Sequence, residues 1–158
     1  MRSAAWENLA TPEGGICASS YSLYDDLAAG GVGTIITGFT SVDGNDRYFG
    51  GMMRLCNNAL VSEYKKLVNI IKRHDVAAIT QLALGAYYAR GRDGQFREID
   101  IDYMSREQIA DMIKKFVEAG RRAAQADFDG VQIHAAHFFF LSRFISPAVN
   151  HRNDDYGG

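Results

Sequence analysis

The sequence predicts an α/β fold in which helices alternate with the strands of a parallel sheet. Stretches with apolar residues at helical spacing alternate along the chain with short apolar runs, most of them rich in β-branched residues. The resulting order is helix, strand, helix, strand, helix, strand, and elements of this length favour right-handed βαβ units. Sixteen glycines against two prolines indicate many tight turns and little linker.

The first predicted helix begins at Ser20, whose hydroxyl can cap it, and ends at the pair Gly30-Gly31. The run that follows, residues 32–37 (VGTIIT), is β-branched and predicts a buried strand. Residues 2–5 are interpreted as the end of an earlier strand. The apolar positions of the first predicted helix are Leu23, Tyr24, Leu27 and Ala28.

Residues 43–46 (DGND) are of types that favour a turn. Residues 50–58 show no regular spacing of apolar residues and are expected to form a loop. A second helix is predicted over residues 62–74, and the run 76–82 (VAAITQL) is the next strand. Residues 85–102 are expected to be a long loop, which in a compact domain is usually functional. The apolar face of the second helix consists of Tyr64, Leu67, Val68 and Ile71.

The third helix has the clearest signal, because Ser105 and Gln108 match a capping box. The apolar stripe that follows is expected to be ordinary core. Residues 128–133 (FDGVQI) then read as a buried strand. The stripe consists of Ile109, Met112, Ile113, Phe116 and Val117.

Size and composition limit the class of protein. The chain has 158 residues, enough for one domain with a sizeable core but short of the roughly 250 of a complete (β/α)8 barrel. A net charge of −2 gives no reason to expect a nucleic acid or a membrane as partner. Cys17 and Cys56 form no CxxC pair, and two free thiols in a reducing compartment favour a cytoplasmic location.

Two histidines, His134 and His137, follow the last predicted strand, at the end where α/β barrels keep their chemistry. They face one cavity if the chain turns helical there, and two neutral imidazoles can then donate hydrogen bonds to one developing oxyanion. Two other interpretations stay open. The pair is compatible with zinc, as in a metal-dependent hydrolase, although no third ligand of obvious spacing follows. It can also be bonded to local backbone or carboxylates.

The residues around this pair resemble the Old Yellow Enzyme family of FMN-dependent NADH:flavin oxidoreductases and ene-reductases. Residues 128–137 (FDGVQIHAAH) are similar to the fourth strand and the catalytic histidine pair of that family. Residues 141–147 (LSRFISP) and the spaced pattern in residues 150–158 are similar to the loop that follows. The charged side chains of that loop are expected to form a surface network of ion pairs that orders it. They are Arg152, Asp154 and Asp155.

The resemblance also implies contacts with FMN. Gly38 is similar to the second-strand residue where the flavin ring approaches the backbone, and Gln81 to the third-strand glutamine whose amide reaches the flavin pyrimidine. Each has an ordinary alternative, a turn residue for Gly38 and a partner for neighbouring backbone for Gln81. Trp6 is interpreted as a core or lid aromatic. The expected cofactor contacts are Ser3, Ala4, Ala5, Gly38, Gln81 and His134.

The activity that the resemblance implies is hydride transfer from NAD(P)H through FMN to an activated alkene such as an enone. His134 and His137 are the implied catalytic residues, because they hold the oxygen of this small-molecule substrate and stabilise its developing charge. One departure is that Phe139 stands where the family commonly has a tyrosine that supplies a proton. Water or another residue then gives the proton, or another acceptor takes the hydride. A second is Leu84-Gly85-Ala86, which replaces a basic family motif.

The chain ends after the loop that follows the fourth strand, so the resemblance implies that residues 1–158 are a single, incomplete domain. This domain is expected to be the amino-terminal half of an FMN-binding TIM (β/α)8 barrel, roughly the first four βα units without the closing half. Two open strand edges predict a homo-oligomer or pairing with a missing carboxyl-terminal half. The phosphate loops commonly follow strands seven and eight, so weak FMN retention is expected. The alternative function is a non-catalytic half-barrel that acts only in assembly.

Overall fold

The computed structural model describes residues 1–157, which form a parallel sheet flanked by helices. The strand order is β2-β1-β3-β6, and all neighbouring strands in this sheet run parallel. The predicted α/β fold and its alternation of helix and strand are therefore confirmed. The four strands are β1 (Thr34–Ser41), β2 (Met53–Arg54), β3 (Ala77–Ala83) and β6 (Gly130–Ile133).

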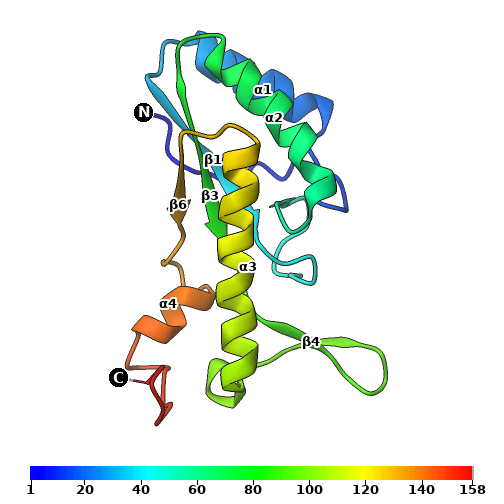
Figure 1. Ribbon diagram of the computed structural model, residues 1–158, viewed down its shortest axis with the longest axis vertical. Helices are drawn as coiled ribbons and strands as arrows, with labels where there is room; N and C mark the ends of the chain where they lie inside the picture. The colour runs from blue at the N-terminus through cyan, green and yellow to red at the C-terminus, as the bar shows by residue number, and fades with distance from the viewer. Residues whose placement is uncertain (158) are drawn as a thin grey trace.

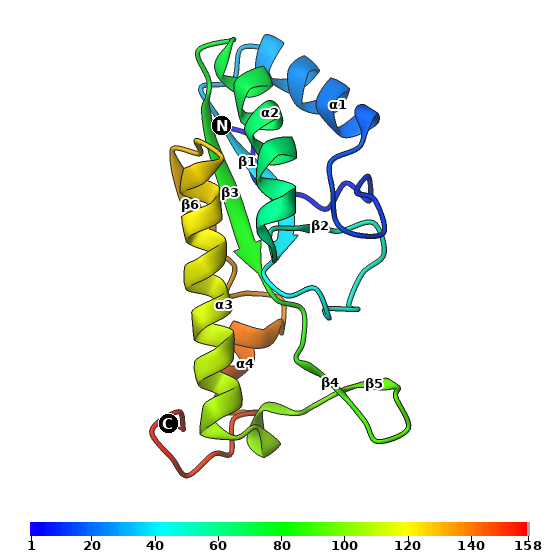
Figure 2. The same cartoon turned by 45° about the vertical axis from the view of Figure 1, so that its right-hand side comes forward.

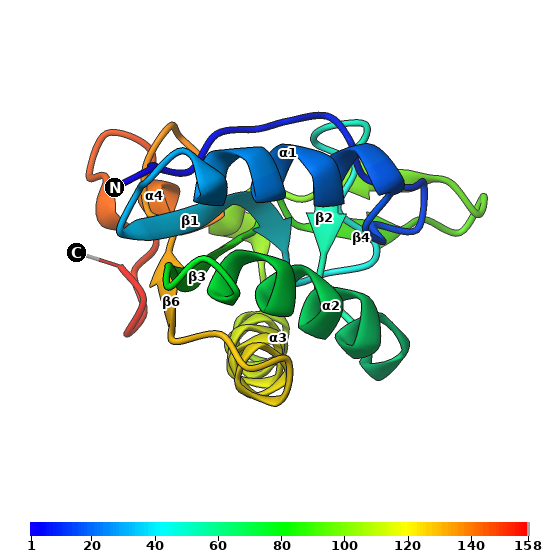
Figure 3. The same cartoon turned by 90° about the horizontal axis from the view of Figure 1, so that it is seen from above.

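Three helices pack along the sheet: α1 precedes β1, whereas α2 and α3 connect strands of the sheet. Figure 3 shows α1 and α2 side by side, with α3 next to α2. In Figure 1 the long helix α3 begins near the hairpin that contains β4 and runs beside β3 and β6. The helices are α1 (Ala18–Ala29), α2 (Val61–Lys72) and α3 (Arg106–Gln125). None of the helices in residues 1–157 is long and apolar enough to span a bilayer.

Helix α1 begins earlier than predicted. Its N-cap is Cys17, so the prediction that Ser20 caps the helix is wrong. Ser20 lies on the buried face instead, one turn before Tyr24, and its hydroxyl donates to the Leu9 carbonyl oxygen at 3.1 Å. A buried hydroxyl needs such a partner, and the Leu9 carbonyl oxygen provides it. The end of the helix at Gly30 is confirmed.

The other two helices match their patterns more closely. All four predicted apolar residues of α2 are buried. The capping box of α3 is present in both directions between Ser105 and Gln108. Ile113 and Val117 are 51% and 48% exposed, however, so the prediction that the whole stripe is core is wrong. Ile113 borders an open apolar hollow between this helix and Phe140, Leu141 and Phe144, so those side chains cover it only in part.

Both predicted loops contain short elements. Within residues 50–58, β2 pairs in parallel with the carboxyl end of β1. It has only two residues, too few to show the alternation of a strand in the sequence. The long loop 85–102 carries the antiparallel hairpin of β4 and β5, which projects from the body of the molecule (Figure 2). The short elements here are η1 (Asn58–Leu60), β4 (Tyr88–Arg90), β5 (Phe96–Glu98) and η2 (Ile101–Tyr103). The turn predicted over residues 43–46 is confirmed.

Strand β6 is an edge strand, so the prediction that residues 128–133 are a buried strand is wrong. Within the described chain β6 pairs with β3 alone. Val131 and Ile133 are therefore 44% and 48% exposed, although Phe128, just before the strand, is buried. The loop expected after the histidines contains the short helix α4 (Phe140–Ile145).

The N-terminal segment lies beside β1. Arg2 forms a parallel bridge to Ile35, and its backbone exchanges hydrogen bonds with Thr34 and Ile36. The interpretation of residues 2–5 as the end of a strand is confirmed only at Arg2, because residues 3–5 have no strand assignment. This placement brings the residues after Arg2 to the carboxyl ends of β1 and β3.

Candidate active site

A cavity of about 210 Å³ lies at the carboxyl ends of β1, β3 and β6. Three different stretches of chain contribute to it: the N-terminal segment, the strand ends with the loop after β1, and the turn after β6. Its position is the one expected for chemistry on a parallel α/β sheet. The lining residues are Ala4, Ala5, Trp6, Phe39, Phe49, Gln81, His134, His137 and Phe139.

The two histidines meet at this cavity. Their ring centroids are 5.2 Å apart with the planes at 64°; His134 is buried and His137 is exposed. The chain does not turn helical between them, so that expectation is wrong. Instead His137 and Phe138 adopt left-handed conformations with φ of 58° and 57°. Left-handed backbone at non-glycine residues is costly and clusters at functional sites.

The protonation of His134 follows from its surroundings. The backbone N–H of Ala136 donates to Nδ1 of His134 at 3.2 Å, so Nδ1 is an acceptor and the proton lies on Nε2. Burial, and secondly the neighbouring His137, lower the pKa of His134. At neutral pH the ring is therefore a neutral imidazole with one N–H available as a donor.

An aromatic cluster packs around the histidine pair, with Phe139 at its centre. The Phe139 ring lies 4.9 Å from that of His134 and 5.5 Å from that of Phe39, measured between centroids. Phe139 is 8% exposed and carries no ionisable proton. Trp6 stacks on Phe49 with centroids 4.8 Å apart, and forms the more exposed end of the cluster.

Sequence reasoning missed Phe39 and Phe49 as lining residues. Phe39 follows Gly38 directly at the end of β1, and that position was the available signal for a side chain at the site. Phe49 lies in the irregular stretch before β2, where no periodicity marks it.

The predicted cofactor contacts divide into two groups. Ala4, Ala5, Gln81 and His134 line the cavity together. Ser3 is exposed and Gly38 is buried, and both lie outside the lining. A Cβ at Gly38 would be 2.1 Å from the Ala5 carbonyl oxygen, so glycine is needed there to admit the N-terminal segment.

The lining suits one part of FMN better than another. Nε2 of Gln81 donates to Oε1 of Gln132 at 2.7 Å, and this amide pair offers both donors and acceptors, as the pyrimidine edge of a flavin requires. Backbone at Ala4 and Ala5 and the aromatic walls suit a flat ring. Among the described lining residues there is no Lys or Arg, and the volume is below the 300–1,000 Å³ of typical ligand sites. The residues therefore fit the ring and not the phosphate.

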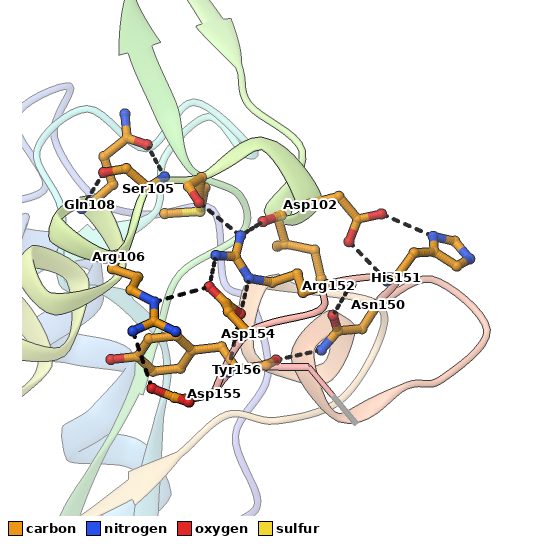
Figure 4. A network of polar contacts seen from close by, with 12 residues as sticks. Asp102, Ser105, Arg106, Gln108, Asn150, His151, Arg152, Asp154, Asp155 and Tyr156 are labelled. Atoms are coloured by element: carbon orange, nitrogen blue, oxygen red, sulfur yellow. Dashed lines mark hydrogen bonds and ion pairs between the residues drawn. The ribbon is translucent and has the colours of Figure 1, made fainter.

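Figure 4 shows the predicted ion network of the C-terminal segment. None of its residues lines the cavity. Arg152 is nearly buried, contacts Asp154 through Nε and Nη2 at 3.0 and 2.5 Å, and donates through Nη1 to the carbonyl oxygens of Ile101 and Met104. Arg152 holds the pKa of Asp154 down at about 2. The network ties the segment to η2 and, through Arg106, to α3. The predicted ordering role is confirmed.

Comparisons with known proteins place the chain in context. Residues 4–158 match the model of the NADH:flavin oxidoreductase / NADH oxidase family. An NADPH dehydrogenase of Bacillus cytotoxicus is 33% identical over 144 residues, covering 85% of this chain and 42% of that protein. An NADH:acrylate oxidoreductase of Vibrio harveyi is 31% identical over 160 residues, covering 92% of this chain and 16% of that protein. The chain thus spans less than half the length of these relatives.

Solved structures give the same fold. The Old Yellow Enzyme homologue from Zymomonas mobilis superposes with a TM-score of 0.82 at 22% identity, over 99% of this chain and 50% of that one. A 2-naphthoyl-CoA reductase complex superposes with a TM-score of 0.89 at 19% identity, over 99% and 28%. The half-length match to the first of these confirms the predicted partial TIM barrel.

Proposed function

Because the chain belongs to the NADH:flavin oxidoreductase / NADH oxidase family, we propose that its cavity is the acceptor-binding side of an FMN-dependent oxidoreductase site. FMN with NAD(P)H as electron donor, the predicted cofactors, is what the family and its relatives indicate. The observation that carries the proposal is the pair of imidazoles 5.2 Å apart at a cavity that Gln81 and residues 4–5 also line.

His134 and His137 bind the oxygen of an activated alkene, such as the carbonyl oxygen of an enone. The neutral ring of His134 donates through Nε2–H, because Nδ1 is occupied by the Ala136 N–H. His137, exposed beside it, gives the second donor. Both hydrogen bonds strengthen as negative charge develops on that oxygen, which is how such donors lower a barrier.

Ala4, Ala5, Gln81 and His134 would hold the flavin ring. When bound, FMN supplies the hydride transfer from NAD(P)H to the acceptor. The aromatic side chains of Trp6, Phe39 and Phe49 keep water from this side of the cavity. Phe139 gives no proton, so solvent or another residue protonates the product, or the physiological acceptor takes up its proton elsewhere.

The other half of the site has to come from outside residues 1–157. The edge of β6 and the N-terminal segment beside β1 are the two open ends of the sheet in barrel order. Exposed Val131 and Ile133 make the β6 side apolar, and exposed edges of this kind pair with other chains. We propose that a second copy or a carboxyl-terminal half docks there and supplies the phosphate site.

Anaerobic titration tests the proposal. The chain is mixed with FMN, NADH is added, and 2-cyclohexen-1-one follows, with flavin absorbance recorded throughout. We expect bleaching by NADH and reoxidation by the enone. Because His137 is proposed to hold the acceptor and not the flavin, we expect His137→Ala to bleach normally but reoxidise slowly. A chain that never bleaches FMN, alone or with a carboxyl-terminal half, would instead favour the assembly function. The cytoplasmic location stays a proposal that rests on the free thiols of Cys17 and Cys56.

A further inference from the structure

A buried polar network lies beneath the N-terminal segment of the cavity. The Arg2 guanidinium contacts Oε1 of Glu7 at 2.5 Å and donates to the Ile36 carbonyl oxygen at 3.0 Å. The hydroxyl of Tyr24 donates to the same Glu7 oxygen at 2.9 Å and accepts from the Gly38 N–H at 3.0 Å. The network therefore joins the segment on both sides of residues 4–6 to α1 and β1.

Tyr24 is the central member of this network. It lies on α1 and is 1% exposed, so its hydroxyl depends on these two partners. Burial, and secondly the charge of Glu7, raise the pKa of Tyr24, and the hydroxyl keeps its proton and donates at all physiological pH values. The Arg2 guanidinium also lies 5.6 Å from the centre of the Tyr24 ring.

Gly38 completes the arrangement by its lack of a side chain. A Cβ there would lie 2.1 Å from the Ala5 carbonyl oxygen and 2.2 Å from Oε2 of Glu7. The segment therefore lies in direct contact with the backbone of β1. The hydroxyl of Tyr24 is hydrogen-bonded to Glu7 at the end of the segment and to Gly38 in the strand.

We propose that Tyr24 is a positioning residue of the site. Through Glu7 and Gly38 it fixes the segment Ala4–Trp6 against β1, and so sets the floor on which the flavin ring and the acceptor are placed. Tyr24 does not line the cavity, so it acts through the segment. Its effect on cofactor binding rests on the proposed function, whereas its effect on the segment does not.

The only tryptophan in the sequence reports on this segment directly. Trp6 lies in it and stacks on Phe49, so its emission and its access to a quencher depend on where the segment lies. In the cofactor-free chain we expect Tyr24→Phe to shift Trp6 emission to longer wavelength and to increase quenching by acrylamide. Loss of a buried hydrogen bond lowers the ratio of docked to released segment by about fivefold.

Tyr21→Phe is the matched control. Tyr21 lies on the same helix. Its hydroxyl donates at 3.2 Å to the carbonyl oxygen of Glu63, which belongs to α2 and not to the N-terminal segment. We expect this variant to leave Trp6 emission unchanged. Equal shifts in both variants, or no shift in Tyr24→Phe with its far-ultraviolet circular dichroism intact, would overturn the assignment.

A second variant covers the case in which Tyr24→Phe does not fold. Glu7→Gln keeps the size of the side chain and removes its charge, and we expect a smaller shift of Trp6 emission in the same direction. An unshifted, folded Glu7→Gln would then overturn the proposal.

FMN binding, followed by quenching of flavin fluorescence, separates the two claims. We expect the dissociation constant for FMN to rise in Tyr24→Phe as the docked fraction of the segment falls, by at most about fivefold. If Trp6 emission shifts while the affinity for FMN stays the same, the positioning role is supported and the proposed contact of Ala4 and Ala5 with the flavin is wrong.

Discussion

Strands β1 and β6 belong to one parallel sheet, yet their environments differ sharply. All but the first of the eight residues of β1 are buried, since strands flank it on both sides and side chains of α1 and α2 pack against it. In β6 the last three of four residues are exposed. Both strands contain β-branched apolar residues, so burial here is decided by neighbours rather than by residue type. The β6 side is where another surface can dock.

The largest expected effect compares the same substitution in the two strands. Ile35→Ala in β1 removes a completely buried side chain, and we expect it to lower the free energy of unfolding by about 2–5 kcal/mol. Ile133→Ala in β6 removes a side chain that is 48% exposed within the single chain, and at concentrations where the chain is a monomer it should cost about 1 kcal/mol or less. Urea denaturation measures both. Similar losses would mean that β6 is covered in solution.

Removal of a histidine tests the site that β6 positions. His134→Ala deletes one hydrogen-bond donor to the developing oxyanion, and we expect a loss of about 10²–10³ in the rate of enone reduction. The measurement is kcat in the flavin-loaded protein, with NADH-dependent bleaching as the internal control. If bleaching and enone reduction fall together, His134 serves flavin binding rather than the acceptor.

Mass in solution tests the open edge itself. We expect the chain to elute as a dimer or larger species, and Val131→Lys/Ile133→Lys to shift it to about half that mass or less, because buried lysines oppose edge pairing. Light scattering coupled to size exclusion gives the mass. A compact, stable wild-type monomer would contradict the proposal that a second copy docks on β6.

A smaller gain is expected at Phe139. Phe139→Tyr places a hydroxyl in the ring cluster beside His134 and His137, whose centroids lie 4.9 and 5.8 Å from that of Phe139. General acids commonly contribute more, but an unoptimised donor should raise enone reduction only about tenfold. Turnover with a proton-independent acceptor such as ferricyanide is the control and should not change. A gain with both acceptors would exclude proton donation as the cause.

The smallest effect concerns the C-terminal network. Arg152 holds the pKa of Asp154 at about 2, below the roughly 3.9 of an unfolded chain, so the ionised form favours folding. Its contribution is complete above about pH 5 and is lost as the pH falls through about 2 to about 1. We expect Asp154→Asn to be less stable than the wild type at about pH 6 and equally stable at about pH 1, as measured by urea denaturation. A difference that persists at about pH 1 would point to packing instead.

Much of the fold was predictable because it depends on local patterns. The face of α2 and the capping box of α3 arise from residues three or four apart, and the structure has both as predicted. The edge position of β6 and the hairpin of β4 and β5 were missed, because a local pattern contains no information on which strands lie next to each other.

The site shows the same division. A motif after a strand was enough to bring His134 and His137 together in the prediction, but not to predict the left-handed backbone at His137 that brings the rings side by side. The flavin contact of Gly38 stays a prediction, but no local pattern shows that a Cβ there would meet the Ala5 carbonyl oxygen, more than thirty residues away in the chain.

The sequence by itself determined the alternation of helices and strands, the family, and the presence of a histidine pair at a strand end. These follow from residue types at fixed short spacings. Only the tertiary structure decided which apolar residues are buried and what lies beneath the N-terminal segment. The contacts of Tyr24 with Glu7 and Gly38 join three elements of the fold, and such contacts exist only once hydrophobic burial has brought those elements together.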